Sequence, residues 1–427
     1  MSNSNIRPFK AITYNQNKIS NLSRVVCPPY DVISPADQNY YHELDAHNFI
    51  HILLGKDIPG EDKYKRAAAI FKDWLKENIL IQDDSGAFYF YSQQYIIRGE
   101  RKMRYGFIAL LRLGDKSSSV FGHENTRLAA KEDRLKLLKQ VKANLSPIFS
   151  VFQDNKRIIA RIFQHQIKDK EPFIEVVDKE KTVHKLWRID LPEVIQNINE
   201  SMAGENIFIA DGHHRYEVAC AYRDLIKEKL ADKFTGEEDC NYILSYFTNP
   251  DPRGLSILPI HRLVKLDSKL DLNEFKSKLK EYFDINEIKE RAKFFFLMEK
   301  GGRTEHVIGM YKDKKYFLLR LKNIKILDKE ITNKPREYKA LDTCILNTMI
   351  LQKILGVDVE NKECIKFDPY PEDFIREVDK DGTYIAFFLN PVRFEQISAV
   401  ALKGERMPSK STYFYPKVLS GLVINKL

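Results

Sequence analysis

The sequence lacks the motifs of the commonest nucleotide and hydrolase sites. It contains no G-x-x-x-x-G-K-[ST] loop, no G-x-G-x-x-G after a strand pattern, no H-E-x-x-H and no G-x-S-x-G. The spacing of each motif follows from the geometry of the site that it forms. The sequence therefore indicates neither a P-loop nor a Rossmann site, and neither a zinc-protease helix nor a nucleophile elbow.

Cysteines and long hydrophobic runs are also scarce. The five cysteines are widely spaced and never form a C-x-x-C pair, which argues against a disulfide framework and a zinc knuckle. No apolar run approaches the ~18 residues of a membrane span, and the stretch 384–389 has only the length of a strand. The first residues lack the features of a signal peptide. We expect a cytoplasmic protein without a membrane partner.

Positive charge is present but not concentrated. The formal net charge is +9, and the lysines alternate with acidic residues without a block of five or six like charges. Proteins that bind nucleic acid usually gather one sign of charge on one face. DNA remains a possible partner, but a well-solvated mixed surface is favoured.

The 427 residues allow two or three domains. Strand and helix patterns alternate in an α+β manner, and the composition shifts near Leu266. We predict one domain at 1–265 and a C-terminal α+β domain at 266–427, and we leave open whether its last strand and 407–417 loop return to the site. Hydrophobic periodicity predicts helices at 63–80, 128–141, 340–355 and 371–378, and strands at 88–97, 104–113, 294–299, 304–311, 316–321 and 384–389.

The stretch around Asp211 is the most informative part of the chain. A short apolar strand at 207–210 is followed by Asp211-Gly212 and then by a helical pattern that begins with His213-His214-Arg215. A helix that starts after a glycine presents free backbone N–H groups and a positive dipole end to an anion, most often a phosphate. We predict the active or ligand site here.

Three further stretches carry chemistry. His123 and Glu124 precede the helix at 128–141, which Asn125 or Thr126 can cap. Lys410 is surrounded by hydroxyl groups, an arrangement suited to phosphate oxygens and equally typical of a surface loop. The stiff segment Pro28-Pro29-Tyr30-Asp31 could line a pocket or form a structural corner, and we leave both interpretations open.

Four motifs together resemble a widespread bacterial and archaeal family that is known only as a domain of unknown function. They are P-P-Y-D-V-I at 28–33, G-H-E-N-T at 122–126, D-G-H-H-R-Y at 211–216 and M-P-S-K-S-T at 407–412. The central turn looks like the G-x-x-R phosphate-binding turn of the ParB/sulfiredoxin superfamily, which includes nucleotide-binding ParB proteins, sulfiredoxins and free serine kinases. The resemblance implies a ParB/sulfiredoxin-like core at 1–265.

The resemblance implies a nucleotide-dependent phosphotransferase that uses ATP or ADP with Mg²⁺ and acts on a hydroxyl of a small metabolite such as a free amino acid. Asp211 and His214 are candidate catalytic residues, Asp211 is also the candidate magnesium ligand, and Glu124 is the base that the chemistry suggests. The candidate nucleotide contacts are Gly212, His213, His214, Arg215, His123, Thr126, Lys410, Ser411 and Thr412.

The sequence also departs from this superfamily. Sulfiredoxins need a cysteine in the turn, where this chain has His213 and His214, and no helix-turn-helix of the ParB type is discernible. Two alternatives stay open. One is a ParB-like nucleotide-binding regulator that binds DNA or a partner, and the other is a metal-dependent phosphatase.

Overall fold

The computed structural model describes residues 5–114, 119–124, 128–267, 269–359, 361 and 363–427. Contacts between Cα atoms divide the chain into two units. The first unit consists of residues 1–122, 126–256 and 416–427, and the second of residues 123–125 and 257–415. The predicted boundary near 265 falls at the end of a strand of the second unit. The assignment of a phosphate-binding domain to 1–265 stays a prediction.

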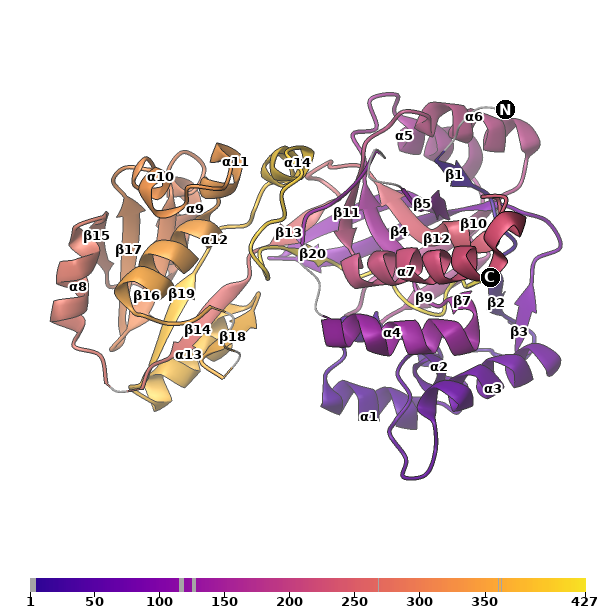
Figure 1. Cartoon of the computed structure of the whole chain (residues 1–427), viewed down its shortest axis with the longest axis horizontal. Coiled ribbons are helices and arrows are strands. Elements are labelled where there is room, and N and C mark those ends of the chain that lie inside the picture. The colour runs from indigo at the N-terminus through magenta and orange to yellow at the C-terminus, as the bar shows by residue number, and fades with distance from the viewer. Residues whose placement is uncertain (1–4, 115–118, 125–127, 268, 360, 362) are drawn as a thin grey trace. The chain divides into compact units, whose positions relative to one another are not determined.

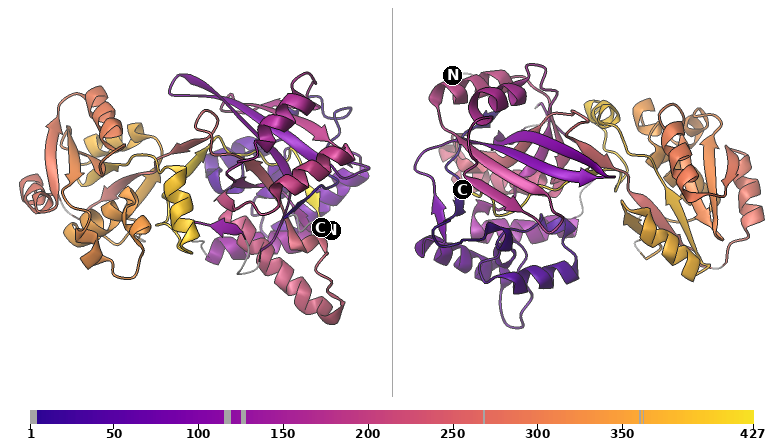
Figure 2. Two further views of the ribbon diagram at one scale, coloured as in Figure 1. Left: turned by 90° about the horizontal axis from the view of Figure 1, so that it is seen from above. Right: turned by 180° about the vertical axis from the view of Figure 1, so that it is seen from behind.

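The first unit is built on one twisted, mixed sheet with strands in the order β6-β11-β8-β12-β5-β4-β10-β9, and β1 pairs with β5 (Figure 1). Strand β11 runs parallel to β6 and antiparallel to β8, and β12 runs parallel to β8. The long hairpin of β4 and β5 is visible in purple from behind (Figure 2). The strands are β1 Ile6–Arg7, β2 Ile12–Tyr14, β3 Leu80–Gln82, β4 Phe88–Ile97, β5 Glu100–Arg112, β6 Val120–Gly122, β7 Ala143–Asn144, β8 Ile148–Val151, β9 Ile174–Val177, β10 Val183–Ile189, β11 Ile207–Asp211, β12 Tyr242–Thr248 and β21 Asn425–Lys426.

Helices cover this sheet because its strands are apolar on both faces. Helices α5 and α6 contribute buried isoleucines and a methionine to a core with Phe90, Phe107 and Phe247. Helices α4 and α7 lie side by side and share a smaller apolar cluster (Figure 1). The helices of this unit are α1 Pro35–Leu44, α2 Ile50–Leu53, α3 Lys63–Lys76, α4 Leu128–Val141, α5 Ile158–Ile162, α6 Pro192–Met202 and α7 His213–Leu230.

The C-terminal segment 416–427 belongs to the first unit. Its strand β21 pairs with β7, and isolated bridges join Ile424 to Ile12 and Ser420 to Cys27. The buried side chain of Arg104 on β5 donates to the carbonyl of Pro416. The segment is therefore fixed to the first unit at several points along its length.

The second unit has an antiparallel sheet with strands in the order β15-β17-β16-β19-β14-β18 and a separate apolar core on each face. Its strands are β13 Ser256–Leu258, which begins at the boundary, β14 His261–Lys265, β15 Phe283–Ile288, β16 Val307–Lys312, β17 Lys315–Leu321, β18 Ile365–Asp368, β19 Tyr384–Phe388 and β20 Tyr413–Tyr415. Its helices are α8 Leu272–Lys280, α9 Arg291–Gly301, α10 Ile326–Glu330, α11 Arg336–Lys339, α12 Asp342–Ile345, which continues as a π-helix at 346–354, α13 Pro371–Lys380 and α14 Phe394–Leu402.

The strand predicted at 294–299 is wrong, because this stretch lies within α9. Its aromatic residues favour a strand by propensity, but tertiary packing overrides that preference. Phe294 and Met298, four residues apart, are buried on one helix face, whereas Phe296 is exposed. The helix at 63–80 also ends earlier than predicted, at Lys76, and Leu80 begins β3.

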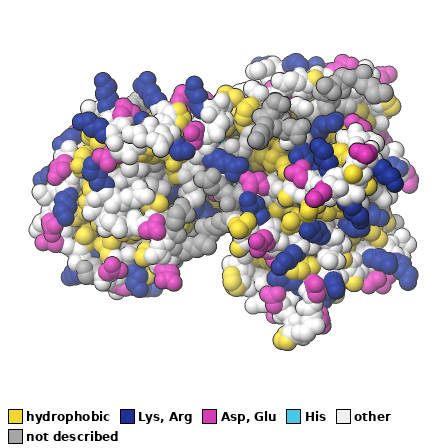
Figure 3. All heavy atoms as spheres, viewed as in Figure 1, with side chains coloured by type: hydrophobic (Ala, Val, Ile, Leu, Met, Phe, Trp, Pro, Cys, Tyr) yellow, Lys and Arg dark blue, Asp and Glu magenta, His cyan; other side chains and the backbone are white. Residues whose placement is uncertain are grey.

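The α+β class predicted from the sequence is confirmed, since both units combine sheets with helices. None of the helices within the described ranges combines the length and apolar character needed to cross a membrane. Basic and acidic side chains are interspersed on the face of the molecule shown in Figure 3, as their alternation in the sequence predicts.

Gly106 on β5 is a position where packing leaves no room for a side chain. A Cβ at Gly106 would lie 2.2 Å from the carbonyl oxygen of Phe247 and 2.4 Å from Cε2 of Tyr246. We expect Gly106→Ala to lower the free energy of unfolding by at least about 1–3 kcal/mol, the usual cost of overpacking, measured by urea denaturation. Gly86→Ala in the same unit is the control, because its Cβ would meet nothing closer than 3.7 Å. Equal stability of the two variants would contradict this packing.

Candidate functional site

A turn of left-handed backbone joins β11 to α7. Gly212 is the N-cap residue, its φ is +89°, and no side chain caps the helix. Glycine adopts this conformation without the steric penalty of other residues. The strand, glycine and helix predicted around Asp211 are thereby confirmed, and the positive end of the helix dipole lies at this turn.

Asp211, the last residue of β11, carries a carboxylate that two cations hold. Lys417 Nζ lies 2.7 Å from Oδ1, and Arg215 Nη2 lies 3.0 Å from Oδ2. The exposed fraction is 18% for the Asp211 side chain, 12% for Lys417 and 11% for Arg215. Burial alone would raise the pKa of Asp211, but Lys417 and then Arg215 hold that pKa at about 2. The carboxylate is therefore ionised at neutral pH.

Arg215 is fixed from several directions. Its Nη1 donates to the carbonyl of Pro147, and its guanidinium folds back over Gly212, where a Cβ would lie 3.0 Å from Cζ. Its Nε–H is buried and has no hydrogen-bond partner within the part of the chain that the structure describes. Because an unpaired buried donor is costly, this N–H group is ready to meet an acceptor oxygen.

Asp31 is a second carboxylate in the electrostatic field of Asp211. It lies on the short 3-10 helix Tyr30–Val32, which follows the extended Pro29. Asp31 is exposed to solvent on one side, although many protein atoms surround its carboxyl group. Desolvation and then the negative charge of Asp211 raise the pKa of Asp31, against the opposing effect of Arg215 and Lys417. Two aspartates of one site thus have pKa values displaced in opposite directions.

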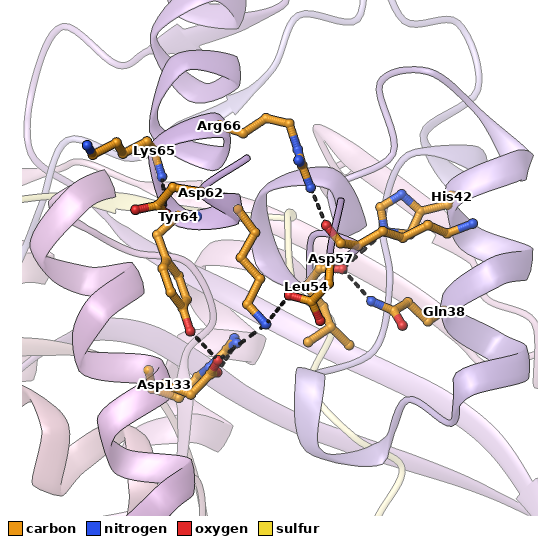
Figure 4. A network of polar contacts seen from close by, with 12 residues as sticks. Gln38, His42, Leu54, Asp57, Asp62, Tyr64, Lys65, Arg66 and Asp133 are labelled. Atoms are coloured by element: carbon orange, nitrogen blue, oxygen red, sulfur yellow. Dashed lines mark hydrogen bonds and ion pairs between the residues drawn. The ribbon is translucent and has the colours of Figure 1, made fainter. Parts of the chain in front are cut away.

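The ring of Tyr30 connects this pair to a partly buried network of polar groups. The Arg134 guanidinium lies over the Tyr30 ring, 4.3 Å from its centroid. Arg134 is held by Asp133, which also accepts a 2.7 Å hydrogen bond from Tyr64 Oη (Figure 4). Burial and then Asp31 raise the pKa of Tyr30 to about 12, so that its hydroxyl stays protonated.

A cavity of about 60 Å³ lies beside Tyr30 and Arg215, with room for a few water molecules. The Tyr30 hydroxyl is buried and, like Arg215 Nε, has no hydrogen-bond partner among the described residues. The cavity is lined by Tyr30, Leu53, Arg134, Leu137, Leu138, Ala143, Asn144, Leu145, Ser146, Arg215, Val218, Ala219 and Ile243.

The two predicted histidines of the turn lie on the first turn of α7. His213 is buried, and Gly122 of β6 is so close that a Cβ there would lie 3.4 Å from the His213 ring. The positive charge of His213, when protonated, lowers the pKa of Asp211 further. His214 is partly exposed. The structure thus brings together Asp211, Gly212, His213, His214 and Arg215 in the first unit.

The other predicted residues lie in the second unit and contact one another there. His123 Nε2 lies 3.2 Å from Thr412 Oγ1, and Glu124 forms an isolated bridge with Met407. The Lys410 N–H lies 3.5 Å from Glu124 Oε1, and Ser411 is buried in the same loop. Two motifs nearly 300 residues apart in the sequence therefore form one cluster.

Thr126, together with Asn125, lies outside the described residues.

Asp211 does not offer a ready metal site. Both of its oxygens are bound by cations, and no group of three or more histidine, cysteine, aspartate or glutamate side chains across the described ranges is placed to hold a metal ion. A magnesium ion at Asp211 stays a prediction, and it would have to displace Lys417 or Arg215.

Sequence reasoning missed Lys417 and Arg134 and left Asp31 undecided. Lys417 ends the 407–417 stretch that the sequence singled out, but its ion pair spans 206 residues. The double proline before Tyr30-Asp31 was the available signal for the second carboxylate. No local pattern marks Arg134, which lies on α4.

The comparisons with known proteins define the family. The model of the family described as "Protein of unknown function (DUF1015)" matches residues 6–344, and the chain belongs to this family. No curated protein matches the chain.

Several solved structures resemble the chain weakly. A free serine kinase in complex with AMP has 15% identity and a TM-score of 0.34, covering 73% of this chain and 91% of its own. SbnI with a C-terminal truncation, from Staphylococcus aureus, has 11% identity and a TM-score of 0.37, with coverages of 73% and 85%. A conserved hypothetical protein from Pyrococcus furiosus has 13% identity and a TM-score of 0.33, with coverages of 73% and 92%. At these scores the likeness carries no conclusion about activity.

The depressed pKa of Asp211 makes a testable contribution to acid stability. A folded-state pKa of about 2, against an ordinary 3.8, stabilises the fold above pH 4, and this contribution is lost as the pH falls through 2. We expect Asp211→Asn to be destabilised by roughly 2 kcal/mol or more at pH 7, and the difference from wild type to narrow as the pH falls from 5 to 2. Urea denaturation across this range measures it.

Asp224→Asn, which removes an exposed carboxylate of α7, is the control and should show no such narrowing. If the free energy of unfolding of Asp211→Asn differed from that of wild type by the same amount at all pH values, the ionised state of Asp211 would be contradicted.

Two constraints require glycine at position 212. Its backbone has a positive φ, and the Arg215 guanidinium lies where a Cβ would need space. We expect Gly212→Ala to lose about 1–2 kcal/mol of stability from left-handed strain and a further increment from displacing Arg215. Gly204→Ala is the matched control, because Gly204 has a φ of +78° but nothing within 4 Å of its Cβ position. Denaturation of both variants isolates the cost of moving Arg215, and equal losses would show that the guanidinium does not need the space.

Proposed function

We propose that the first unit is a nucleotide-dependent phosphotransferase that acts on a hydroxyl of a small metabolite, such as a free amino acid. The observation that supports the proposal is the pairing of two aspartates with opposite pKa displacements next to two cations and a helix start. Sites that run acid–base chemistry near neutral pH commonly separate the pKa values of two titratable groups in this way.

The cations supply what a phosphoryl group needs. In phosphoryl transfer, charge is spread over the equatorial oxygens, and catalysis rests on positioning and electrostatic stabilisation. Lys417 and Arg215 are both held by Asp211, and Arg215 Nε–H is an unused donor. In the proposal, phosphate oxygens bind at these cations and at the first turn of α7, while Asp211 keeps both cations in place.

Asp31 supplies the base. It is exposed, and its raised pKa makes the carboxylate more basic than an ordinary aspartate. In the proposed reaction the substrate hydroxyl gives its proton to Asp31, and its oxygen forms a bond to the terminal phosphorus. The bond from that phosphorus to the bridging oxygen breaks, and the shortened nucleotide leaves. The Mg²⁺ that normally accompanies a nucleotide would arrive with the phosphates.

The other candidates keep the roles that the sequence suggests. His214 lies on the first turn of α7, where it can contact phosphate or substrate. Glu124, His123 and the 410–412 hydroxyl cluster belong to the second unit, and their contribution as base or nucleotide contacts stays a prediction.

Two assays test the proposal with purified protein. Thermal shift against ATP, ADP, CTP and GTP, with and without Mg²⁺, reports binding, and transfer of the labelled terminal phosphate of ATP or ADP to a panel of hydroxylated metabolites reports chemistry. We expect a Mg²⁺-dependent shift with an adenine nucleotide that Arg215→Met abolishes. We expect Asp31→Asn to keep the shift and to lose about 100-fold to 10,000-fold in transfer rate.

Asp224→Asn is again the matched control and should retain both activities. Unchanged transfer by Asp31→Asn would remove Asp31 as the base. Absence of both nucleotide binding and transfer would remove the proposed function, whereas a CTP-selective shift with DNA binding would favour the ParB-like regulator. Hydrolysis of phosphoesters without a nucleotide would favour the phosphatase.

A further inference from the structure

The second unit contains a pocket that the proposed function does not use. Its volume is about 570 Å³, within the range of small-molecule sites. It lies where β16 begins and β19 ends, and these strands are antiparallel neighbours, so that both ends meet at one edge of the sheet. The residues that follow β19 and those that precede β16 form two of its walls, and the last turn of α9 with α11, α12 and α14 forms the rest.

A histidine held by an aspartate faces this pocket. His306 Nδ1 lies 2.8 Å from Asp342 Oδ1, and both residues line the cavity. A carboxylate accepts hydrogen bonds, so the Nδ1 of a neutral His306 carries the proton and Nε2 carries the lone pair. Nε2 has no hydrogen-bond partner among the residues that the structure describes. The dyad therefore presents one fixed acceptor atom, with exposed fractions of 30% and 18% for the two side chains.

The charges around the pocket select the kind of ligand. Five acidic side chains line it against two arginines, which are Arg303 and Arg393. Glu299 pairs with Arg303, and Glu305 pairs with Arg320 from outside the pocket. Neither Glu337 nor Glu395 has an ion-pair partner in the described parts of the chain.

What remains in the pocket is three carboxylates against Arg393, whose positive charge acts on Asp342, and this leaves a surplus of negatively charged hydrogen-bond acceptors. The groups in question are the carboxylates of Asp342, Glu337 and Glu395 and the Nε2 atom of His306. They are spread around a ligand-sized space, and no three acidic, histidine or cysteine side chains among the described residues converge on a metal position. Such a surface suits several N–H donors carried on one flexible molecule.

We propose that this pocket binds a small organic cation with two or more ammonium groups, a linear polyamine in its chemistry. One ammonium group donates to His306 Nε2 beside Asp342, and a second lies between Glu337 and Glu395. The site is separate from the phosphotransferase cluster and does not rest on the proposed function.

The test is calorimetric titration of the full chain with spermidine in the absence of nucleotide. We expect saturable one-to-one binding that weakens as salt rises from 50 to 300 mM, because exposed charges are screened. The double variant Glu337→Gln and Glu395→Gln, at a partly exposed and an exposed position, should weaken binding at least about tenfold. Asp342→Asn should weaken it similarly. Glu281→Gln, which removes an exposed carboxylate of the same unit outside the pocket, should leave it unchanged.

The His306 imidazole gives a second readout. An ammonium group lies at Nε2 in the proposed complex, so the NMR signals of the labelled His306 ring should shift when spermidine is added. The inference is overturned if wild type binds no spermidine at millimolar concentration, if the double variant binds as tightly as wild type, or if Mg²⁺ at equal ionic strength competes equally well. This last result would identify counter-ion screening only. None of these results bears on transfer of phosphate by the first unit.

Discussion

The buried carboxylate of Asp211 is the constraint on which the candidate site of the first unit depends. It fixes a lysine from the C-terminal segment and an arginine from α7 at the end of one strand. Removing one member of such a cluster leaves an uncompensated charge in a poorly solvated place, which costs more than the pair itself contributes. The ion pairs with Lys417 and Arg215 therefore tie local backbone geometry at Gly212 to the docking of a segment that lies 206 residues away. The Asp211 side chain therefore makes both a local contact and a long-range contact.

Two aspartates of identical chemistry acquire different properties at this site. Asp211 has cations on both oxygens, and its pKa falls to about 2, whereas desolvation and then the negative charge of Asp211 raise the pKa of Asp31. The difference comes from neighbours rather than from residue type. This difference in pKa would allow Asp211 to hold the two cations in place while Asp31 exchanges a proton.

The strand, glycine and helix around Asp211 could be predicted because each depends on a few consecutive residues. The strand needs an apolar run, the turn needs glycine, and the helix needs apolar residues at helical spacing. Lys417 could not be predicted as a partner of Asp211, because nothing in the residues around either position encodes a contact over such a separation. Aromatic residues at 294–296 misled the prediction, since the buried face of α9 is decided by the sheet it packs against. The contact between Glu124 and Met407 joins two motifs that the sequence could recognise only separately.

The path of the chain through the two units has a consequence for the order of events during synthesis. The first unit begins at the N-terminal residues but takes its last strand from 416–427, after the whole second unit. A ribosome therefore synthesises the second unit, which is nearly continuous in sequence, before it adds Lys417, the partner of Asp211. Until then Asp211 lacks one of its two cations, β7 lacks its pairing with β21, and Arg104 lacks the Pro416 carbonyl to which it donates. The ion-pair cluster around Asp211 is thus completed only after the second unit has been synthesised, and a nascent chain that stops before residue 417 cannot carry it.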